Sequence, residues 1–205
     1  MIENNINKSK YHRKEPIRNF EVNQSMYDLF SNVNSKNLNS NAIRYMTHRK
    51  TYGQILNETD KLANALKSIG VNENEIVGSC ILTVPETASI LLSIDKINAI
   101  SFWMDASLGE EDIIKYINEH HIKTLFLFEP LKPMMDKIID KTNLEHVILI
   151  SPMEYIYNPF RKKLTDKRYI YYSDFINTKS KTPIITKYDK ERPSIIVQSS
   201  GSTGK

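Results

Sequence analysis

The last seven residues of this 205-residue chain have types and a spacing that suit phosphate binding. Glycine is scarce, with six residues in all, yet two of the six fall in this run and alternate with four hydroxyl side chains. Glycine lets the backbone bend and approach an anion closely, successive amide groups can point at the anion, and hydroxyls add donors. We therefore expect phosphate contacts from six consecutive residues: Ser199, Ser200, Gly201, Ser202, Thr203 and Gly204. The alternative is a flexible tail of serine and glycine.

The segment just before this run reads as a strand. Residues 194–198 are mostly apolar, with Ile195, Ile196 and Val197 at the centre, and they lead directly into the glycines. A strand of this kind holds the following loop at the carboxyl edge of a sheet, which is where nucleotides bind in α/β folds. The position of the loop therefore agrees with its composition.

Upstream, short apolar runs alternate with segments of helical periodicity. Strands are expected at 76–82, 99–103, 124–128 and 146–150, and helices at 55–69, 85–98, 109–120 and 133–141. Short strands that alternate with longer helices imply βαβ units and a parallel sheet. We therefore predict an α/β fold with a mostly parallel sheet flanked by helices.

The remaining segments are less regular. Residues 1–24 are polar and charged without a sustained period, and we interpret them as an N-terminal extension. Order is expected to begin with a short helix capped by Ser25, followed by a strand at 42–46 and a polar turn at 47–50. Gly70 is expected to end the first long helix in a left-handed conformation. Residues 151–192 read as a loop, with a short helical turn at 172–175.

Two classes of phosphate loop compete for the final run. The loop of the P-loop nucleotide hydrolases has the form G-x-x-x-x-G-K-[ST]. When Gly204 and Lys205 are aligned with its Gly-Lys pair, Ser199 falls on the leading glycine, which is a mismatch. The P-loop interpretation is therefore the weaker one.

The second class matches better. The run from Ser199 to Lys205 resembles the signature of the adenylate-forming superfamily, which includes acyl-CoA synthetases, luciferases and nonribosomal-peptide adenylation domains. That signature reads Ser/Thr-Ser/Gly-Gly-Ser/Thr-Thr-Gly-any-Pro-Lys. Lys205 takes its variable position, so it does not inherit the role of the family's lysine. The Pro-Lys pair itself would follow residue 205.

The resemblance extends upstream to about Ser25. Residues 50–55 are similar to the family's Thr-Tyr-x-Glu/Gln-Leu segment, residues 62–71 to its Leu-Ala-x-x-Leu…Gly-Val, and residues 96–100 to a run that ends in Lys-x-Gly-Ala. Asn98 departs from this pattern, because the family usually has glycine there. On this basis residues 25–205 are interpreted as an incomplete AMP-binding (adenylation) domain that ends inside its phosphate-binding loop.

The resemblance implies an activity. Family members activate a carboxylic acid with ATP and Mg²⁺ to give an acyl-adenylate and pyrophosphate, and most then pass the acyl group to a thiol, commonly that of coenzyme A. Residues 199–204 would contact the ATP phosphates. The adenine contacts, the Mg²⁺-binding acid, the acyl pocket and the catalytic lysine of the family lie further along the chain. We therefore expect an N-terminal fragment that is inactive alone and that contains no catalytic or metal-binding residue.

Two other functions stay open at this point. One is a non-catalytic remnant or binding module, and the other is a fragment of a P-loop nucleotide hydrolase. The residue after Lys205 separates them, because the adenylate-forming signature requires Pro-Lys there and the P-loop requires Ser or Thr.

Composition excludes several further classes. The net charge of +4 is small and the basic residues form only short clusters, so we expect no nucleic-acid partner. A single cysteine, Cys80, excludes an internal disulfide and a cysteine-built metal site. No apolar run has the length of a membrane span, and no secretory signal begins the sequence. We therefore expect a cytoplasmic location without a transmembrane segment.

Overall fold

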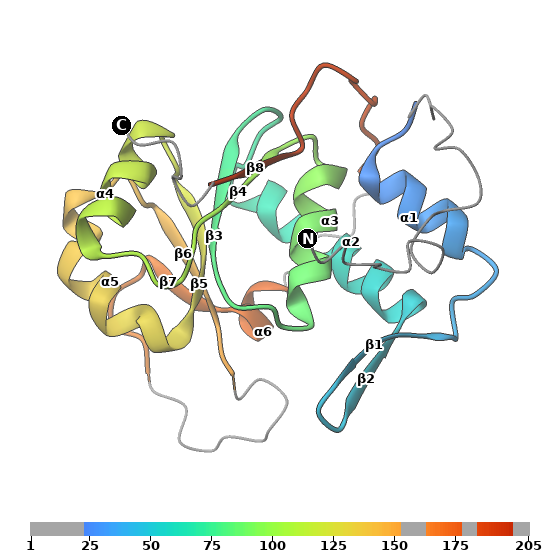
Figure 1. Cartoon of the computed structure of the whole chain (residues 1–205), viewed down its shortest axis with the longest axis horizontal. Helices are drawn as coiled ribbons and strands as arrows, with labels where there is room; N and C mark the ends of the chain where they lie inside the picture. The colour runs from blue at the N-terminus through green and yellow to red at the C-terminus, as the bar shows by residue number, and fades with distance from the viewer. Residues whose placement is uncertain (1–22, 153–162, 178–183, 199–205) are drawn as a thin grey trace, which may run out of the picture.

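A computed structural model of the chain describes residues 23–152, 163–177 and 184–198. Its centre is a sheet of six strands in the order β7-β6-β5-β3-β4-β8, and every neighbouring pair is parallel. The strands are β3 (Ile76–Cys80), β4 (Ile100–Trp103), β5 (Thr124–Phe128), β6 (His146–Ile150), β7 (Tyr169–Tyr171) and β8 (Ile195–Val197). This arrangement confirms the predicted α/β fold (Figure 1).

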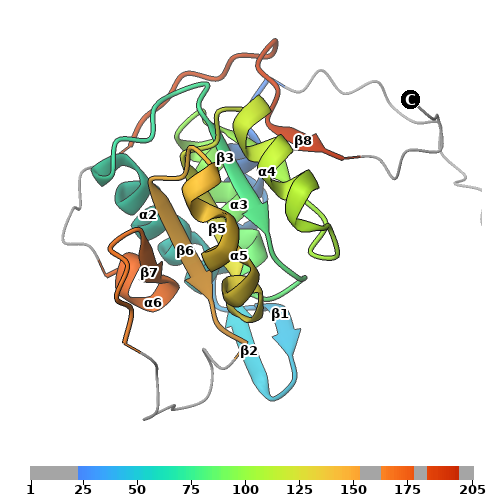
Figure 2. The ribbon, with the colours of Figure 1, turned by 90° about the vertical axis from the view of Figure 1, so that its left-hand side faces the viewer.

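Helices cover both faces of this sheet, as parallel strands require. They are α2 (Tyr52–Ser68), α3 (Glu86–Lys96), α4 (Glu110–Glu119) and α5 (Lys132–Ile138), with short 3₁₀ turns η2 (Glu129–Leu131) and η3 (Ile139–Lys141) on either side of α5. Figure 2 shows α4 and α5 on one face, with α2 and α3 behind the sheet. The chain is therefore wound on both sides of the sheet.

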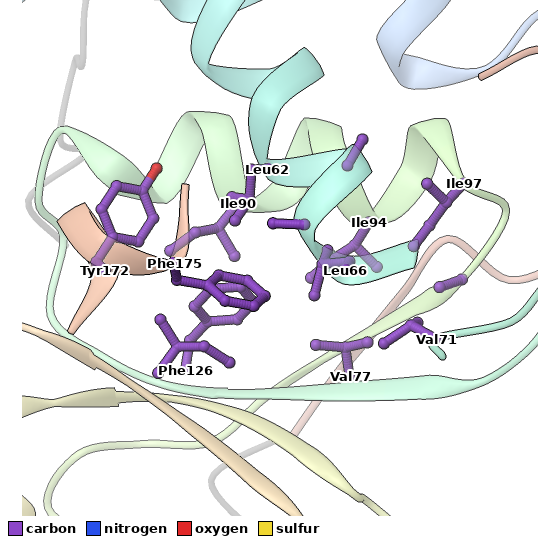
Figure 3. Close-up of a cluster of buried hydrophobic side chains, with 14 of the residues drawn as sticks. Leu62, Leu66, Val71, Val77, Ile90, Ile94, Ile97, Phe126, Tyr172 and Phe175 are labelled. Atoms are coloured by element: carbon purple, nitrogen blue, oxygen red, sulfur yellow. The ribbon is translucent and has the colours of Figure 1, made fainter. Parts of the chain in front are cut away.

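A separate buried cluster fills each side of the sheet. On the α2 and α3 side, Leu66, Ile90 and Ile94 pack against Val77 and Phe126 of the strands, with all five less than 1% exposed (Figure 3). The opposite cluster contains the apolar residues of α4 and α5. The strands are buried from both faces, which explains their continuous apolar sequences.

Three of the helices, α2, α3 and α4, share one type of ending. Gly70, Asn98 and His121 follow α2, α3 and α4, and each has a positive φ, of 92°, 58° and 51° respectively. At Asn98 the amide donates to Asp95 O at 3.0 Å, and the next amide, of Ala99, donates to Ile94 O at 3.1 Å. These two bonds form a Schellman motif. The left-handed ending expected at Gly70 is confirmed, and Asn98 adopts the same conformation in place of glycine.

The amino-terminal part of the described chain is a helix and a hairpin. Helix α1 (Met26–Asn34) begins as predicted at Ser25, whose Oγ accepts the Asp28 amide at 3.0 Å. The strands β1 (Asn41–Tyr45) and β2 (His48–Thr51) pair antiparallel. The predicted turn at 47–50 is therefore wrong over residues 48–50, because the reversal takes only the two residues before His48.

The segment predicted as loop at 151–192 holds one further strand. Strand β7 pairs with the edge of β6, so Val147 lies opposite Tyr169 and Leu149 opposite Tyr171. Both tyrosines are buried. Helix α6 (Tyr172–Phe175) confirms the predicted helical turn. Tyrosines in this pattern are typical of half-buried strands, but the bounds of the strand could not be predicted, because it has only three residues and follows a stretch of charged side chains.

Candidate functional site

The six residues predicted to contact phosphate, Ser199 to Gly204, lie outside the described residues. The structure places the strand that leads to them. Strand β8 pairs with β4 in parallel register, with Ser101 opposite Ile195 and Phe102 opposite Ile196. Residue 199 therefore follows the carboxyl end of an edge strand, which is the predicted position for a phosphate loop.

The connection from β4 to α4 leaves the sheet beside this point. Trp103 and Val197 are the last register partners of the two strands. The next polar side chain after Trp103 is Asp105, whose Oδ1 accepts from the Ser107 amide at 2.8 Å and from Ser107 Oγ at 2.7 Å. These bonds from the backbone and side chain of Ser107 lower the pKa of Asp105. Asp105 therefore acts as an ionised turn residue.

The last described residue is tied to α4. Gln198 Nε2 donates a hydrogen bond to the Tyr116 hydroxyl, on the second turn of α4. The ring of Tyr116 lies 6.0 Å from that of Phe102, centroid to centroid, so the tyrosine also packs on β4. Gln198 Oε1 is buried and has no partner among the described residues. Figure 2 shows β8 beside α4. The strand therefore has a side-chain anchor at its carboxyl end.

A second anchor lies where the chain enters β8. The Arg192 guanidinium contacts the carboxylate of Asp95 at 3.0 Å, and the exposed fractions of the two side chains are 2% and 0%. Sequence reasoning missed this pair. The only available signal was an acid directly after the apolar residues of a helical segment, and such a charge is buried only when it is paired.

The other chemically capable side chains have structural roles. Cys80 is buried, and burial, followed by the charge of Asp105, raises the pKa of its thiol to about 11. His120 stacks on Phe102 with ring centroids 4.4 Å apart. Within the parts of the chain that are described, no three His, Cys, Asp or Glu side chains are grouped so that they could hold a metal ion.

A cavity of about 440 Å³ lies between the β1–β2 hairpin, α2, the start of α3 and α6. Its wall contains the half-buried side chain of Lys50, whose ammonium is 2.7 Å from Glu58 and 3.4 Å from Glu86. Tyr172 donates to Glu58 at 2.6 Å. These contacts join the hairpin to both helices. None of the described residues that line the cavity comes from β4, α4 or β8.

The comparison with protein families now decides the classification. Residues 30–205 match the family of AMP-binding enzymes. The chain belongs to this family. The match covers the whole described sheet and includes the residues predicted to contact phosphate.

Curated relatives of this AMP-binding chain are acetyl-coenzyme A synthetases. The protein from Deinococcus radiodurans is 28% identical over 168 residues, and the one from Streptomyces coelicolor is 23% identical over 167 residues. These alignments cover 75% and 76% of the chain but only 25% of each relative. The chain thus spans about a quarter of the length of the curated relatives that it matches.

Solved structures show the same fold. A long-chain-fatty-acid–CoA ligase from Archaeoglobus fulgidus superposes with a TM-score of 0.73 at 18% identity, covering 89% of this chain and 35% of that protein. An anthranilate CoA ligase, solved with anthranoyl-AMP, gives a TM-score of 0.72 at 20% identity. The superposition covers 84% of this chain and 32% of that protein. At these identities the likeness concerns the fold.

No helix among residues 23–152, 163–177 and 184–198 is both long enough and apolar enough to cross a membrane.

Proposed function

We propose that this chain supplies the ATP-phosphate contacts of an AMP-forming carboxylate–CoA ligase. The observation that carries the proposal is the position of residues 199–204. They follow a parallel edge strand at its carboxyl end, and they join two glycines to four hydroxyl side chains. Membership of the AMP-binding enzyme family supports the same assignment.

The loop would act on the charge that develops when pyrophosphate leaves. Backbone amides and the hydroxyls of Ser202 and Thr203 are donors that can be held in place before the reaction. Donors fixed in this way stabilise a transition state without the reorganisation that water would need. The two anchors of β8, at Arg192 and Gln198, limit the motion of the strand from which the loop emerges.

The cofactors in this proposal are ATP and Mg²⁺. The loop composition suits the phosphates of ATP. The described residues contain no cluster of three acidic, histidine or cysteine side chains for a metal. We therefore propose that this chain contacts the phosphate oxygens. Mg²⁺ would further neutralise the charge of these oxygens.

The substrate is proposed only as a class. The relatives and structural neighbours include proteins named for acetyl, anthraniloyl and long-chain acyl groups. Their shared chemistry is a carboxylic acid and coenzyme A, and we propose this pair for the whole protein that contains this chain. We further propose that the reaction takes place in the cytoplasm, and that the present residues alone do not complete it.

The nature of the nucleotide product tests this function. A protein in which this chain continues to the length of its relatives is incubated with ATP, Mg²⁺, coenzyme A and a panel of carboxylic acids. The proposal expects AMP and pyrophosphate in equal amounts, formed only when a suitable acid is present. ADP and phosphate formed without an acid would instead identify a nucleotide hydrolase, and an absence of nucleotide turnover would favour a binding module.

A further inference from the structure

Strand β8 has little apolar packing to hold it in place. It has three residues and lies at the edge of the sheet, with β4 as its neighbour among the described strands. The side chains of Ile195 and Val197 are 39% and 69% exposed, and only Ile196 packs against the core. Burial of apolar surface is the main force that holds a strand against its sheet. Besides its backbone bonds to β4, the strand therefore needs another interaction to hold its position.

That interaction is polar and lies at the entrance to the strand. Arg192 Nη2 donates to Asp95 Oδ1 at 3.0 Å, and Arg192 Nη1 donates to the carbonyl oxygen of Ala99 at 2.8 Å. Two residues further along, Ser194 Oγ donates to the same Asp95 oxygen at 3.0 Å. The chain that enters β8 is thus fastened to the last turn of α3 and to the residue just before β4.

The other oxygen of the same carboxylate holds the first turn of α1. The Tyr27 amide donates to Asp95 Oδ2 at 2.9 Å. A single buried side chain therefore connects α1, α3 and the entrance to β8, which are separated by 68 and 97 residues in sequence. Figure 1 shows α1 and the segment before β8 near the same end of α3.

A buried ion pair of this kind is a poor source of net stability. Removing two charges from water costs about as much as their attraction returns, so such pairs are best understood through the geometry that they fix. Here the guanidinium does not recover all the hydrogen bonds that it loses with water, because Arg192 Nε is buried without a partner among the described residues. The pair fixes the position at which β8 starts.

We propose that Asp95 and Arg192 are positioning residues for the candidate phosphate loop. Together they set the register of β8 on β4, and seven residues beyond Arg192 the loop begins at Ser199. This inference rests on the proposed function for the role of the loop. The effect on the strand itself can be measured without any nucleotide, so the two proposals can fail separately.

Amide hydrogen exchange of the whole 205-residue chain provides the test. Asp95→Asn and Arg192→Met remove one charge each at nearly constant side-chain size, while Lys123→Met breaks the exposed pair of Lys123 with Glu145 as a matched control. The amide of Ile196, the one in this strand that the parallel register directs at β4, should exchange about tenfold to a hundredfold faster in the first two variants, as expected when bonds to a charged group are lost. Amides of β3, β5 and β6 should keep their wild-type rates, and Lys123→Met should change neither set.

Two further variants separate positioning from general stability. Arg192→Lys restores the charge and should recover part of the protection of β8. Ser194→Ala removes one of the bonds to Asp95 and should give a smaller acceleration in a chain that stays folded. Faster exchange throughout the sheet would overturn the proposal, because the pair would then support the whole fold. Unchanged exchange of β8 in Arg192→Met or Ser194→Ala would overturn it as well.

Discussion

Trp103 and Val197 lie opposite each other at the carboxyl ends of two neighbouring parallel strands. The connection to α4 therefore leaves the sheet beside the carboxyl end of β8. Asp105 lies in this connection, and its carboxylate accepts from the amide of Ser107, a bond that lowers its pKa. Asp105 is therefore already satisfied by its own turn.

The first prediction concerns the chain alone. The 205 residues should show no ATP–pyrophosphate exchange with any carboxylic acid, because the chain covers only 25% of its acetyl-coenzyme A synthetase relatives. Phosphate contacts without the acid and the rest of the nucleotide site do not place the reacting atoms. The Deinococcus relative, assayed in parallel, is the positive control. Acid-dependent exchange by a preparation free of host ligases would show that these residues contain a working site.

The second prediction concerns the loop hydroxyls in a chain continued to the length of its relatives. Ser202→Ala and Thr203→Ala should each lower the rate of adenylate formation by about 10²–10³-fold, the scale of losing one fixed donor to a developing charge. The Kd of the carboxylic acid should hardly change, because neither hydroxyl is expected to touch it. Single-turnover kinetics measures both quantities.

A matched substitution, Ser151→Ala, lies in the connection after β6 and provides the control for these two. If either loop variant keeps the wild-type rate of adenylation, its hydroxyl only shapes the loop. The phosphate contacts must in that case come from backbone amides.

The third prediction concerns the buried thiol. Burial raises the pKa of Cys80 from its ordinary 9.0 to about 11, so the folded chain retains the thiol proton more strongly than the unfolded chain. The contribution of this thiol to the free energy of unfolding is fully present below pH 9.0 and is lost as the pH rises through about 11. Cys80→Ala should therefore flatten the decline of the unfolding free energy over this interval.

The reactivity of the same thiol gives an independent check. At pH 8 an aromatic disulfide reagent should react with Cys80 far more slowly in the native chain than in urea, because the thiolate is the reactive form. Equal rates in the two conditions would mean that the side chain is accessible and that the raised pKa has another origin.

The fourth prediction concerns the left-handed residue after α3. Asn98 has φ 58°, and its Nδ2 donates to Lys187 O at 2.9 Å. Asn98→Ala should lower the free energy of unfolding by about 2–3 kcal/mol, from the left-handed strain of alanine together with the lost hydrogen bond. Asn98→Gly loses the bond without this strain, so it should lie between wild type and alanine.

Urea unfolding measures the order of stability of wild type, Asn98→Gly and Asn98→Ala. Gly70→Ala measures the strain of a left-handed alanine without the loss of a side-chain hydrogen bond. Gly70 has φ 92°, and an added methyl group there would meet no atom within 4 Å. An Asn98→Ala variant as stable as wild type would show that the Schellman ending of α3 contributes little.

Much of the fold could be predicted because the central strands are unambiguous. Residues 124–128 and 146–150 are short apolar runs between helical segments, and β5 and β6 have these bounds. Buried parallel strands give this signal since both their faces are covered. The bounds of the three-residue strand β7 and of the second hairpin strand could not be predicted, because their residues are charged or aromatic and give no clear apolar run.

The candidate site could be described from the sequence only as a composition. The run of serine, threonine and glycine after residue 198 predicts phosphate contacts, and the structure confirms the strand that leads to this run. The buried pair of Asp95 and Arg192 could not be foreseen, since 97 residues separate the partners. A single sequence contains no signal that two such side chains meet.

The most direct test of the central claim is a titration of the ¹⁵N-labelled chain with Mg·ATP, followed by nuclear magnetic resonance. We predict that the amide signals of Gly201 and Gly204 shift with the nucleotide. Sulfate at matched ionic strength should not reproduce these shifts, and a Ser202→Ala, Thr203→Ala double variant should weaken them. Signals of the β1–β2 hairpin should remain in place. Loop signals that stay unchanged while other amides shift, or shifts that sulfate reproduces in full, would contradict the assignment of residues 199–204 as an ATP-phosphate site.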